Sequence, residues 1–192
     1  MTNIKLRSDP LEFSEGYLKV LHWFFSYPTH EIGLNDLSQG LKISKITARK
    51  AVNKLEKEGF LKVEDLGRIW RISCNQQHGY NFSKKISYHL GLIANSNVLK
   101  LIHGIIPNSK AIILFGSYRK GDDIEKSDID IAVEIADDKE LEIMELGMFE
   151  KLGYRKDVKV NLHVFSRNKI NLNLFSNIAN GIVLEGFLEV RP

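Results

Sequence analysis

Apolar residues cluster at helical spacing in the first third of the chain. Seven large apolar side chains occur within residues 14–26, the density of a helix buried on most of its surface. Pro28 ends that helix. A later amphipathic helix is expected to begin at Ser44, whose hydroxyl can cap it, and to end at Gly59. The expected elements are helices over residues 14–26, 34–41 and 44–58, followed by strands over residues 60–65 and 68–73. Three helices followed by a hairpin predict a helix-turn-helix arrangement with two added strands.

The rest of the chain alternates between helical and strand-like patterns. Two helices are expected within residues 82–106, and the wholly apolar run 111–115 predicts a buried strand. Further expected elements are a strand over residues 127–135, a helix over residues 137–151, a strand over residues 158–165, and a short helix and a strand within residues 173–190. The polar run 75–81 predicts a linker, which divides the chain into domains at residues 1–80 and 81–192.

The composition is that of an ordinary globular protein, with 43% hydrophobic and 27% charged residues. No apolar run approaches the roughly 18 residues of a membrane helix, so we expect no membrane contact. Residues 1–16 lack the apolar block of a secretory signal, which predicts a cytoplasmic protein. The single cysteine, Cys74, excludes an internal disulfide and a thiolate metal cluster, and it is expected to be a small buried hydrophobe.

The net charge of +3 comes wholly from the first two-fifths of the chain. Residues 1–80 carry 12 Lys and Arg against 9 Asp and Glu, whereas residues 81–192 carry 15 of each. Within residues 42–62 there are seven basic residues and two acidic ones. This local excess on the third expected helix is typical of a surface that contacts nucleic acid, and also of a solvated helix face.

The segment DLSQGLKISKITARKAVNKLEKEGFLKVEDLGRIWRIS, residues 36–73, resembles the winged-helix domains of bacterial and archaeal transcription regulators. In that family the second helix of the pair enters the major groove and the hairpin touches the neighbouring DNA backbone. The resemblance implies DNA contacts early in the third helix and phosphate contacts from nearby basic residues. The first group is Ser44, Lys45, Thr47, Ala48, Arg49 and Lys50, and the second is Lys54, Lys57, Arg68 and Arg71. The alternative is a winged helix used for dimerisation or protein contact.

Candidate chemistry lies between two strands of the second half. Gly116 and Ser117 directly follow the buried run 111–115, where glycine lets backbone N–H groups approach a phosphate and serine adds a hydroxyl. Asp128 and Asp130 fall on alternate positions of the next strand, so both carboxylates face one side, about 7 Å apart at ~3.4 Å per residue. Such a pair can chelate Mg²⁺ (or Mn²⁺), which would hold triphosphate oxygens and stabilise charge during attack on the α-phosphate.

The same residues closely resemble the minimal nucleotidyltransferases of the DNA polymerase beta superfamily, whose signature is Gly-Ser, ten residues, then Asp-x-Asp. Here Gly116-Ser117 is followed by residues 118–127 and then Asp128-Ile129-Asp130. Gly121 falls at the second family glycine, and Lys120 stands where arginine is common. The resemblance covers residues 86–190 and implies a small domain with a mixed sheet flanked by helices, and hence an α+β chain.

The resemblance also implies an activity and assigns residues to it. ATP or another NTP would be the substrate, and NMP would pass to a hydroxyl of a protein, such as a partner toxin, or of a small molecule. Asp128 and Asp130 would be catalytic and would bind the metal, while Gly116, Ser117 and Lys120 would bind the nucleotide phosphates.

One position departs from the family pattern. The family carries a third carboxylate on a later strand, and the matching position here is Asn161, within residues 158–165. An amide oxygen can still coordinate the metal beside Asp128 and Asp130, but an amide cannot act as a base. His163, on the same strand face, is a candidate base, although such a residue is more often structural.

Two functions therefore stay open from the sequence. One is a Mg²⁺-dependent nucleotidyltransferase that also binds DNA. The other is a DNA-binding transcriptional regulator or antitoxin, whose catalytically degenerate nucleotidyltransferase domain senses nucleotide or forms a homodimer.

Overall fold

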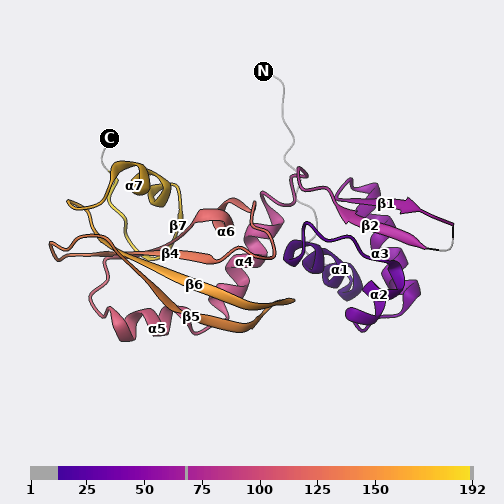
Figure 1. Cartoon of the computed structure of the whole chain (residues 1–192), viewed down its shortest axis with the longest axis horizontal. Coiled ribbons are helices and arrows are strands. Elements are labelled where there is room, and N and C mark those ends of the chain that lie inside the picture. Colours follow the sequence, from indigo (N-terminus) through magenta and orange to yellow (C-terminus); the bar gives the residue numbers. More distant parts are fainter. Residues whose placement is uncertain (1–12, 68, 191–192) are drawn as a thin grey trace, which may run out of the picture.

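The computed structural model describes residues 13–67 and 69–190. Its amino-terminal part consists of three helices and an antiparallel hairpin (Figure 1). These elements are α1 (Glu15–Ser26), α2 (Leu34–Gly40), α3 (Lys45–Lys57), β1 (Leu61–Asp65) and β2 (Trp70–Cys74). The helices and strands expected from the sequence are confirmed here, and the pairing of Leu61 with Cys74 fixes the register of the hairpin.

Local chemistry explains where these helices begin. The hydroxyl of Ser14 accepts a hydrogen bond from the Tyr17 amide, and that of Ser44 accepts one from the Thr47 amide, so both serines are N-caps. The apolar faces of the three helices and the hairpin enclose one core, in which Cys74 is buried as expected. Burial raises the pKa of the Cys74 thiol to about 11, which makes it unreactive at neutral pH.

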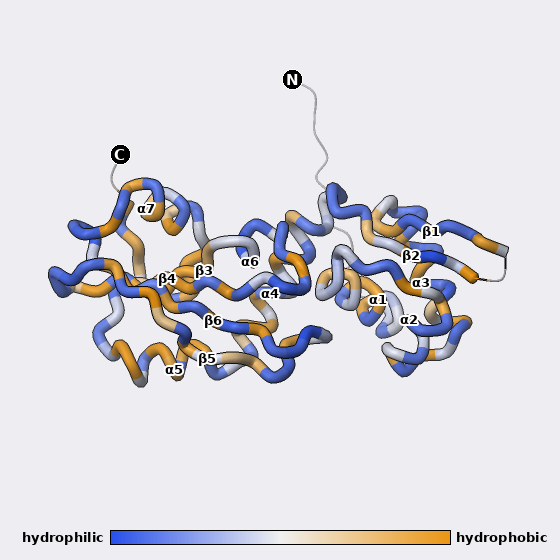
Figure 2. Tube along the Cα trace, viewed as in Figure 1, coloured by the Kyte–Doolittle hydropathy of each residue, from blue (hydrophilic) through white to orange (hydrophobic). Residues whose placement is uncertain are grey.

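The carboxy-terminal part is a five-stranded mixed sheet with helices around it (Figure 1). The elements are α4 (Lys84–Ala94), α5 (Val98–Ile105), β3 (Ala111–Phe115), α6 (Gly116–Lys120), β4 (Ile129–Ile135), β5 (Glu142–Leu152), β6 (Arg155–Ser166), α7 (Leu172–Ala179) and β7 (Ile182–Gly186). The strand order is β5-β6-β4-β3-β7, with β4 and β6 parallel and every other pair antiparallel. Figure 2 shows β3 and part of β4 as hydrophobic segments inside this sheet. The chain therefore has the α+β architecture expected.

The helix expected over residues 137–151 is wrong, because this segment contains the edge strand β5. The apolar residues Leu141, Met144, Leu146 and Phe149 suggested a helix face. In the structure a β-bulge between Glu145 and Gly147 inserts one residue into the strand. Met144 and Phe149 therefore both pack on the core although they are five residues apart. This spacing breaks the two-residue period that would otherwise identify a strand.

The two parts are joined by direct contacts as well as by the chain. The hydroxyl of Tyr27 donates to the carbonyl of Tyr154, and the hydroxyl of Thr29 donates to the carboxylate of Glu125, both at 2.6 Å. The connecting segment is itself packed, since Asn81 is 2% exposed and donates to the carbonyl of Asn75. Among the described residues, no helix combines the length and the apolar character needed to cross a bilayer.

Candidate active site

The tight turn after β3 forms one side of the candidate site. All five residues of β3 are buried, and the chain then turns at Gly116 into the short helix α6. Gly116 has a φ of 71°, and a Cβ added there would lie 2.7 Å from the Asp130 Oδ2 atom. Only glycine fits both the backbone conformation and this close approach. The turn that carries Ser117 is thereby held against the Asp130 carboxylate.

The two predicted acidic residues lie at the start of β4. Phe115 and Asp130 are directly opposed in the antiparallel pair of β3 and β4, which explains why the turn and the carboxylate meet. Ile129 and Ile131 are buried in the core, whereas Asp128 and Asp130 are half-buried on the opposite side of the strand. The structure therefore brings Gly116, Asp128 and Asp130 to one place, as the sequence pattern predicts.

Asn161 and His163 complete this cluster from β6. The parallel register pairs Asn161 with Asp130. The Asn161 amide nitrogen lies 3.4 Å from Asp128 Oδ2 and 3.5 Å from Asp130 Oδ1, the outer limit of hydrogen bonding. His163 Nε2 lies 3.2 Å from Asp130 Oδ1, and its ring packs edge-to-face on Phe115. The sequence placed His163 on this face but did not foresee its contact with Asp130.

The donor set suits one hard cation held together with a nucleotide. Mg²⁺ commonly binds through one or two carboxylates and completes its shell with phosphate oxygens and water, which Asp128 and Asp130 can support. In the described part of the chain, no three His, Cys, Asp or Glu side chains are grouped to hold a metal by themselves. The residue that pairs with Asp130 on β6 is Asn161, whose amide adds no carboxylate to the acidic pair. Its amide oxygen would need to turn toward the cation to become a ligand.

A cavity of about 250 Å³ adjoins the Gly116 turn and contains residues that the sequence reasoning did not assign to a site. Arg119 and Lys120 line it from α6, and Asn177 and Asn180 line it from α7 and its C-cap. Arg119 lies two residues after Ser117, on the helix that begins at the Gly116 turn. A basic residue so close to a candidate phosphate-binding turn is the sequence signal that could have identified Arg119 as a site residue.

A buried charge cluster lies behind the turn. The Lys85 ammonium contacts the Asp123 carboxylate at 2.9 Å and donates to the Asp123 carbonyl at 2.7 Å and to the Gly121 carbonyl at 3.4 Å. Both side chains are 1% exposed. Burial raises the pKa of Asp123 to about 6, although Lys85 opposes this shift. The pair holds the loop that leads from α6 to Asp128.

His89 and Arg155 extend this cluster. His89 Nδ1 lies 3.1 Å from the Tyr118 carbonyl, and burial lowers the pKa of His89 to about 3, so the ring is neutral at pH 7. The Arg155 guanidinium donates to the Tyr118 hydroxyl and to the carbonyls of Glu125 and Ser127. Arg155 thus ties α6 to the residues directly before Asp128. No sequence signal marked these charged residues as buried.

A comparison with known families finds a match within the second half of the chain. Residues 98–183 match the family model described as Nucleotidyltransferase domain. The match runs from the start of α5 into β7, and it includes every residue of the candidate active site but not α1 to α4. Domains of this class generally transfer nucleotides from NTPs with a divalent metal. No curated protein matches the chain.

The residues expected to contact DNA lie at the other end of the molecule, on α3. Lys45, Arg49 and Lys50 are exposed, and the Arg49 guanidinium lies over the Trp70 ring of the hairpin at 4.8 Å. Thr47 is exposed beside the capping Ser44. These side chains share the first two turns of one helix, as expected.

Other members of that predicted set are placed differently. Ala48 is fully buried against the core, so its expected contact with DNA is wrong. Lys54 lies over the Tyr17 ring at 4.8 Å, on the flank of α3. Arg71 forms ion pairs with Glu31 and Glu64, which compensate its charge. Arg68 lies outside the described residues.

Proposed function

We propose that this protein is a Mg²⁺- or Mn²⁺-dependent nucleotidyltransferase that moves NMP from ATP or another NTP to a hydroxyl acceptor. The observation that carries the proposal is the junction of the Gly116 turn with the Asp130 carboxylate, which only glycine permits. It would bring the phosphates bound at Gly116 and Ser117 to a cation held by Asp128 and Asp130. Lys120 and Arg119 would neutralise phosphate charge from α6.

In this reaction the acceptor oxygen attacks the α-phosphorus, a new P–O bond forms, and the bond to pyrophosphate breaks. The divalent cation would supply electrostatic stabilisation of the charge that develops on the phosphoryl oxygens. Asp128 and Asp130 would orient that cation, and the N–H groups of the turn would orient the phosphate. The acceptor that we propose is a protein, such as a partner toxin.

A specific observation favours a second function. The Asn161 amide faces both carboxylates and brings no negative charge to the third metal position. A site of this kind would hold one metal and a nucleotide more readily than it would activate an acceptor hydroxyl. In this alternative the chain is a transcriptional regulator or antitoxin that senses nucleotide or dimerises.

Transfer of label from α-³²P-ATP separates the two functions. The protein is incubated with Mg²⁺ or Mn²⁺ and cell extract, and the variant Asp130→Ala is compared with Asp122→Ala, which changes an exposed carboxylate of the preceding loop. The transferase predicts labelled product with the wild type and Asp122→Ala but none with Asp130→Ala. Nucleotide binding without transfer, together with activity gained by Asn161→Asp, would show a degenerate site and refute the transferase.

For the amino-terminal part we propose DNA binding by a winged helix. The support is the exposed basic surface of Lys45, Arg49 and Lys50 on a helix that is followed by a hairpin. A mobility-shift assay with DNA flanking the gene of this chain tests it at several salt concentrations. The triple alanine variant should weaken binding and flatten its salt dependence, by about 0.9 in log–log slope for each lost phosphate contact. Alanine at the remote Lys100, Lys156 and Lys159 is the matched control, and equal losses in both triple variants would contradict the proposal.

A further inference from the structure

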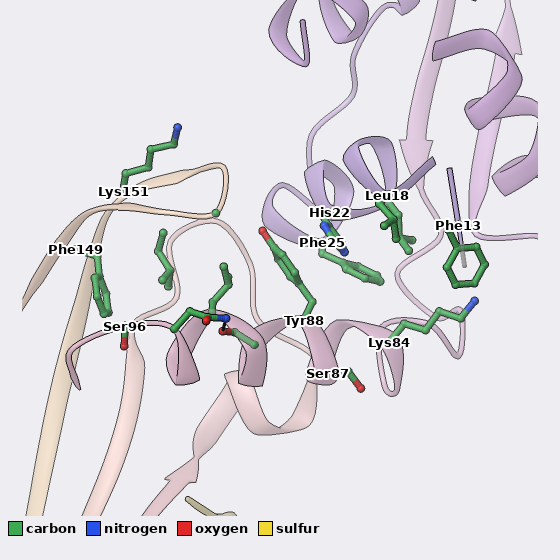
Figure 3. Close-up of a pocket in the computed structure, with 16 residues that line it drawn as sticks. Phe13, Leu18, His22, Phe25, Lys84, Ser87, Tyr88, Ser96, Phe149 and Lys151 are labelled. Carbon is green, nitrogen blue, oxygen red and sulfur yellow. Dashed lines mark hydrogen bonds between the residues drawn. The ribbon is translucent and has the colours of Figure 1, made fainter. Parts of the chain in front are cut away.

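A mainly apolar cavity lies away from the candidate active site, between the two parts of the chain. It has a volume of about 740 Å³ and is bounded by α1, α4 and the turn between β5 and β6 (Figure 3). Leu18 and Phe25 line it from α1, Tyr88 and Leu92 from α4, and Phe149 from β5. The volume is within the ~300–1,000 Å³ range of small-molecule sites. Neither proposed function makes use of it.

The floor of the cavity is α4, which leaves room for a long ligand. Lining residues extend along α4 from Lys84 to Leu92, a length of about 12 Å at ~1.5 Å rise per residue, and continue to Asn95 and Ser96 beyond the end of the helix. Gly91 stands within this stretch, and a Cβ added there would meet no atom within 4 Å. Glycine inside a helix costs about 1 kcal/mol relative to alanine, so Gly91 gives up helix stability and leaves the floor open.

The charges around the cavity have one sign. Lys84 and Lys151 line it near opposite ends in Figure 3, and no Asp or Glu is among the described residues that line it. The third ionisable nitrogen base, His22, stacks on Tyr88 with ring centroids 4.2 Å apart. Burial lowers the pKa of His22, so at neutral pH it contributes a flat, uncharged wall.

We propose that this cavity binds an elongated organic anion with an apolar body, of the fatty-acid type. The apolar walls would cover the hydrocarbon tail of the ligand and exclude water from it, while Lys84 or Lys151 would pair with the anionic head at the rim. A cationic head on the same tail would meet only the positive charges of these two lysines. Because α1 belongs to the amino-terminal part and α4 to the carboxy-terminal part, a ligand in this cavity would hold the two parts in one arrangement.

Calorimetric titration of the full chain with decanoate, below its micellar concentration, tests the proposal. Decyltrimethylammonium and decanol carry the same chain with a positive and a neutral head, and acetate carries the head without the chain. We expect saturable binding of one decanoate per chain, at least about tenfold tighter than that of the cation and with no binding of acetate. Equal affinity for the three decyl compounds, or no binding of decanoate, would overturn the proposal.

Two pairs of variants localise the binding. Gly91→Phe fills the floor, whereas Gly104→Phe places the same side chain on α5, where a Cβ also meets no atom within 4 Å and which does not line this cavity. Only Gly91→Phe should abolish decanoate binding. The double variant Lys84→Gln/Lys151→Gln should weaken it by roughly two- to five-fold, the range of an exposed ion pair, and Lys100→Gln/Lys156→Gln should leave it unchanged. The first of these double variants leaves the apolar walls intact, so it still tests the site if Gly91→Phe does not fold; wild-type affinity in it would contradict the assigned site.

Discussion

Replacement of Lys85 by methionine is expected to destabilise the protein more than any exposed charge change. The Lys85 ammonium makes one ion pair and two carbonyl contacts, and its side chain and that of Asp123 are 1% exposed. Methionine keeps the volume of the side chain but leaves the Asp123 carboxylate buried without its partner. Removal of one member of a buried pair costs about 3–5 kcal/mol, a large fraction of the ~5–15 kcal/mol that stabilises a domain.

The loss should depend on pH in a defined direction. The folded-state pKa of Asp123 is raised above its ordinary value, so its contribution to stability is complete below about pH 4 and is lost as the pH rises through about 6. Without Lys85 the pKa of this carboxyl rises further, because the cation that favoured ionisation is gone. The variant should therefore be most destabilised at pH 8, and the difference from wild type should shrink toward pH 5.

Urea unfolding at pH 5, 6, 7 and 8 measures this difference. Lys84→Met is the matched control, because it changes the neighbouring, half-buried lysine of α4 and should cost less than about 1 kcal/mol. In the double variant Lys85→Met/Asp123→Asn the unpaired charge is absent, so part of the loss should be recovered. If Lys85→Met lowers the free energy of unfolding by less than about 1 kcal/mol at pH 8, or by the same amount from pH 5 to 8, the interpretation of Lys85 and Asp123 as a buried ion pair is refuted.

Three further results are expected from the same structure. Gly116→Ala should weaken binding of a non-hydrolysable NTP about tenfold or more in calorimetry, because its methyl group would stand 2.7 Å from the Asp130 carboxylate; wild-type affinity would contradict this. Gly121→Ala should lower the free energy of unfolding by more than about 1 kcal/mol, since φ is 81° and the methyl group would clash with the Asn81 carbonyl. Gly104→Ala, at an open helix position, should instead raise the free energy of unfolding by up to about 1 kcal/mol. His89 is neutral in the folded protein, with a pKa of about 3, so its contribution to the free energy of unfolding is full above about pH 6.5 and is lost as the pH falls. Below pH 6 the wild type should therefore lose stability relative to His89→Gln by up to about 1.4 kcal/mol per pH unit. Parallel curves of stability against pH for the two proteins would argue against a buried neutral ring.

The sequence predicted the acidic pair and the glycine turn because each is local and carries its own signal. A wholly apolar strand, a glycine-serine turn and two carboxylates at alternate positions can be recognised without knowledge of the partner strands. The antiparallel register of Phe115 with Asp130 then joins them in space. The same argument explains the success with α3, where Ser44 caps a helix of clear amphipathic period.

The features that were missed depend on contacts between distant segments. Residues 142–152 form a strand only because they pair with β6, and the bulge at Gly147 removes the alternation that would have shown it. Lys85, Asp123 and Arg155 are charged residues in polar stretches of the sequence. Because such residues are usually exposed, the sequence alone predicts that their side chains face solvent. Their burial follows from packing α4 against α6, which no local pattern encodes.

The bulge in β5 also bears on how copies of this chain meet. β5 is the last strand on one side of the sheet and presents unpaired backbone groups to solvent. The irregular register near Gly147, together with the exposed carboxylates Glu142, Glu145 and Glu150, makes this border a poor template for another strand. The β5 edge is thereby protected from adding further strands of an open-ended aggregate. A homodimer of this protein would accordingly form through a surface other than this strand.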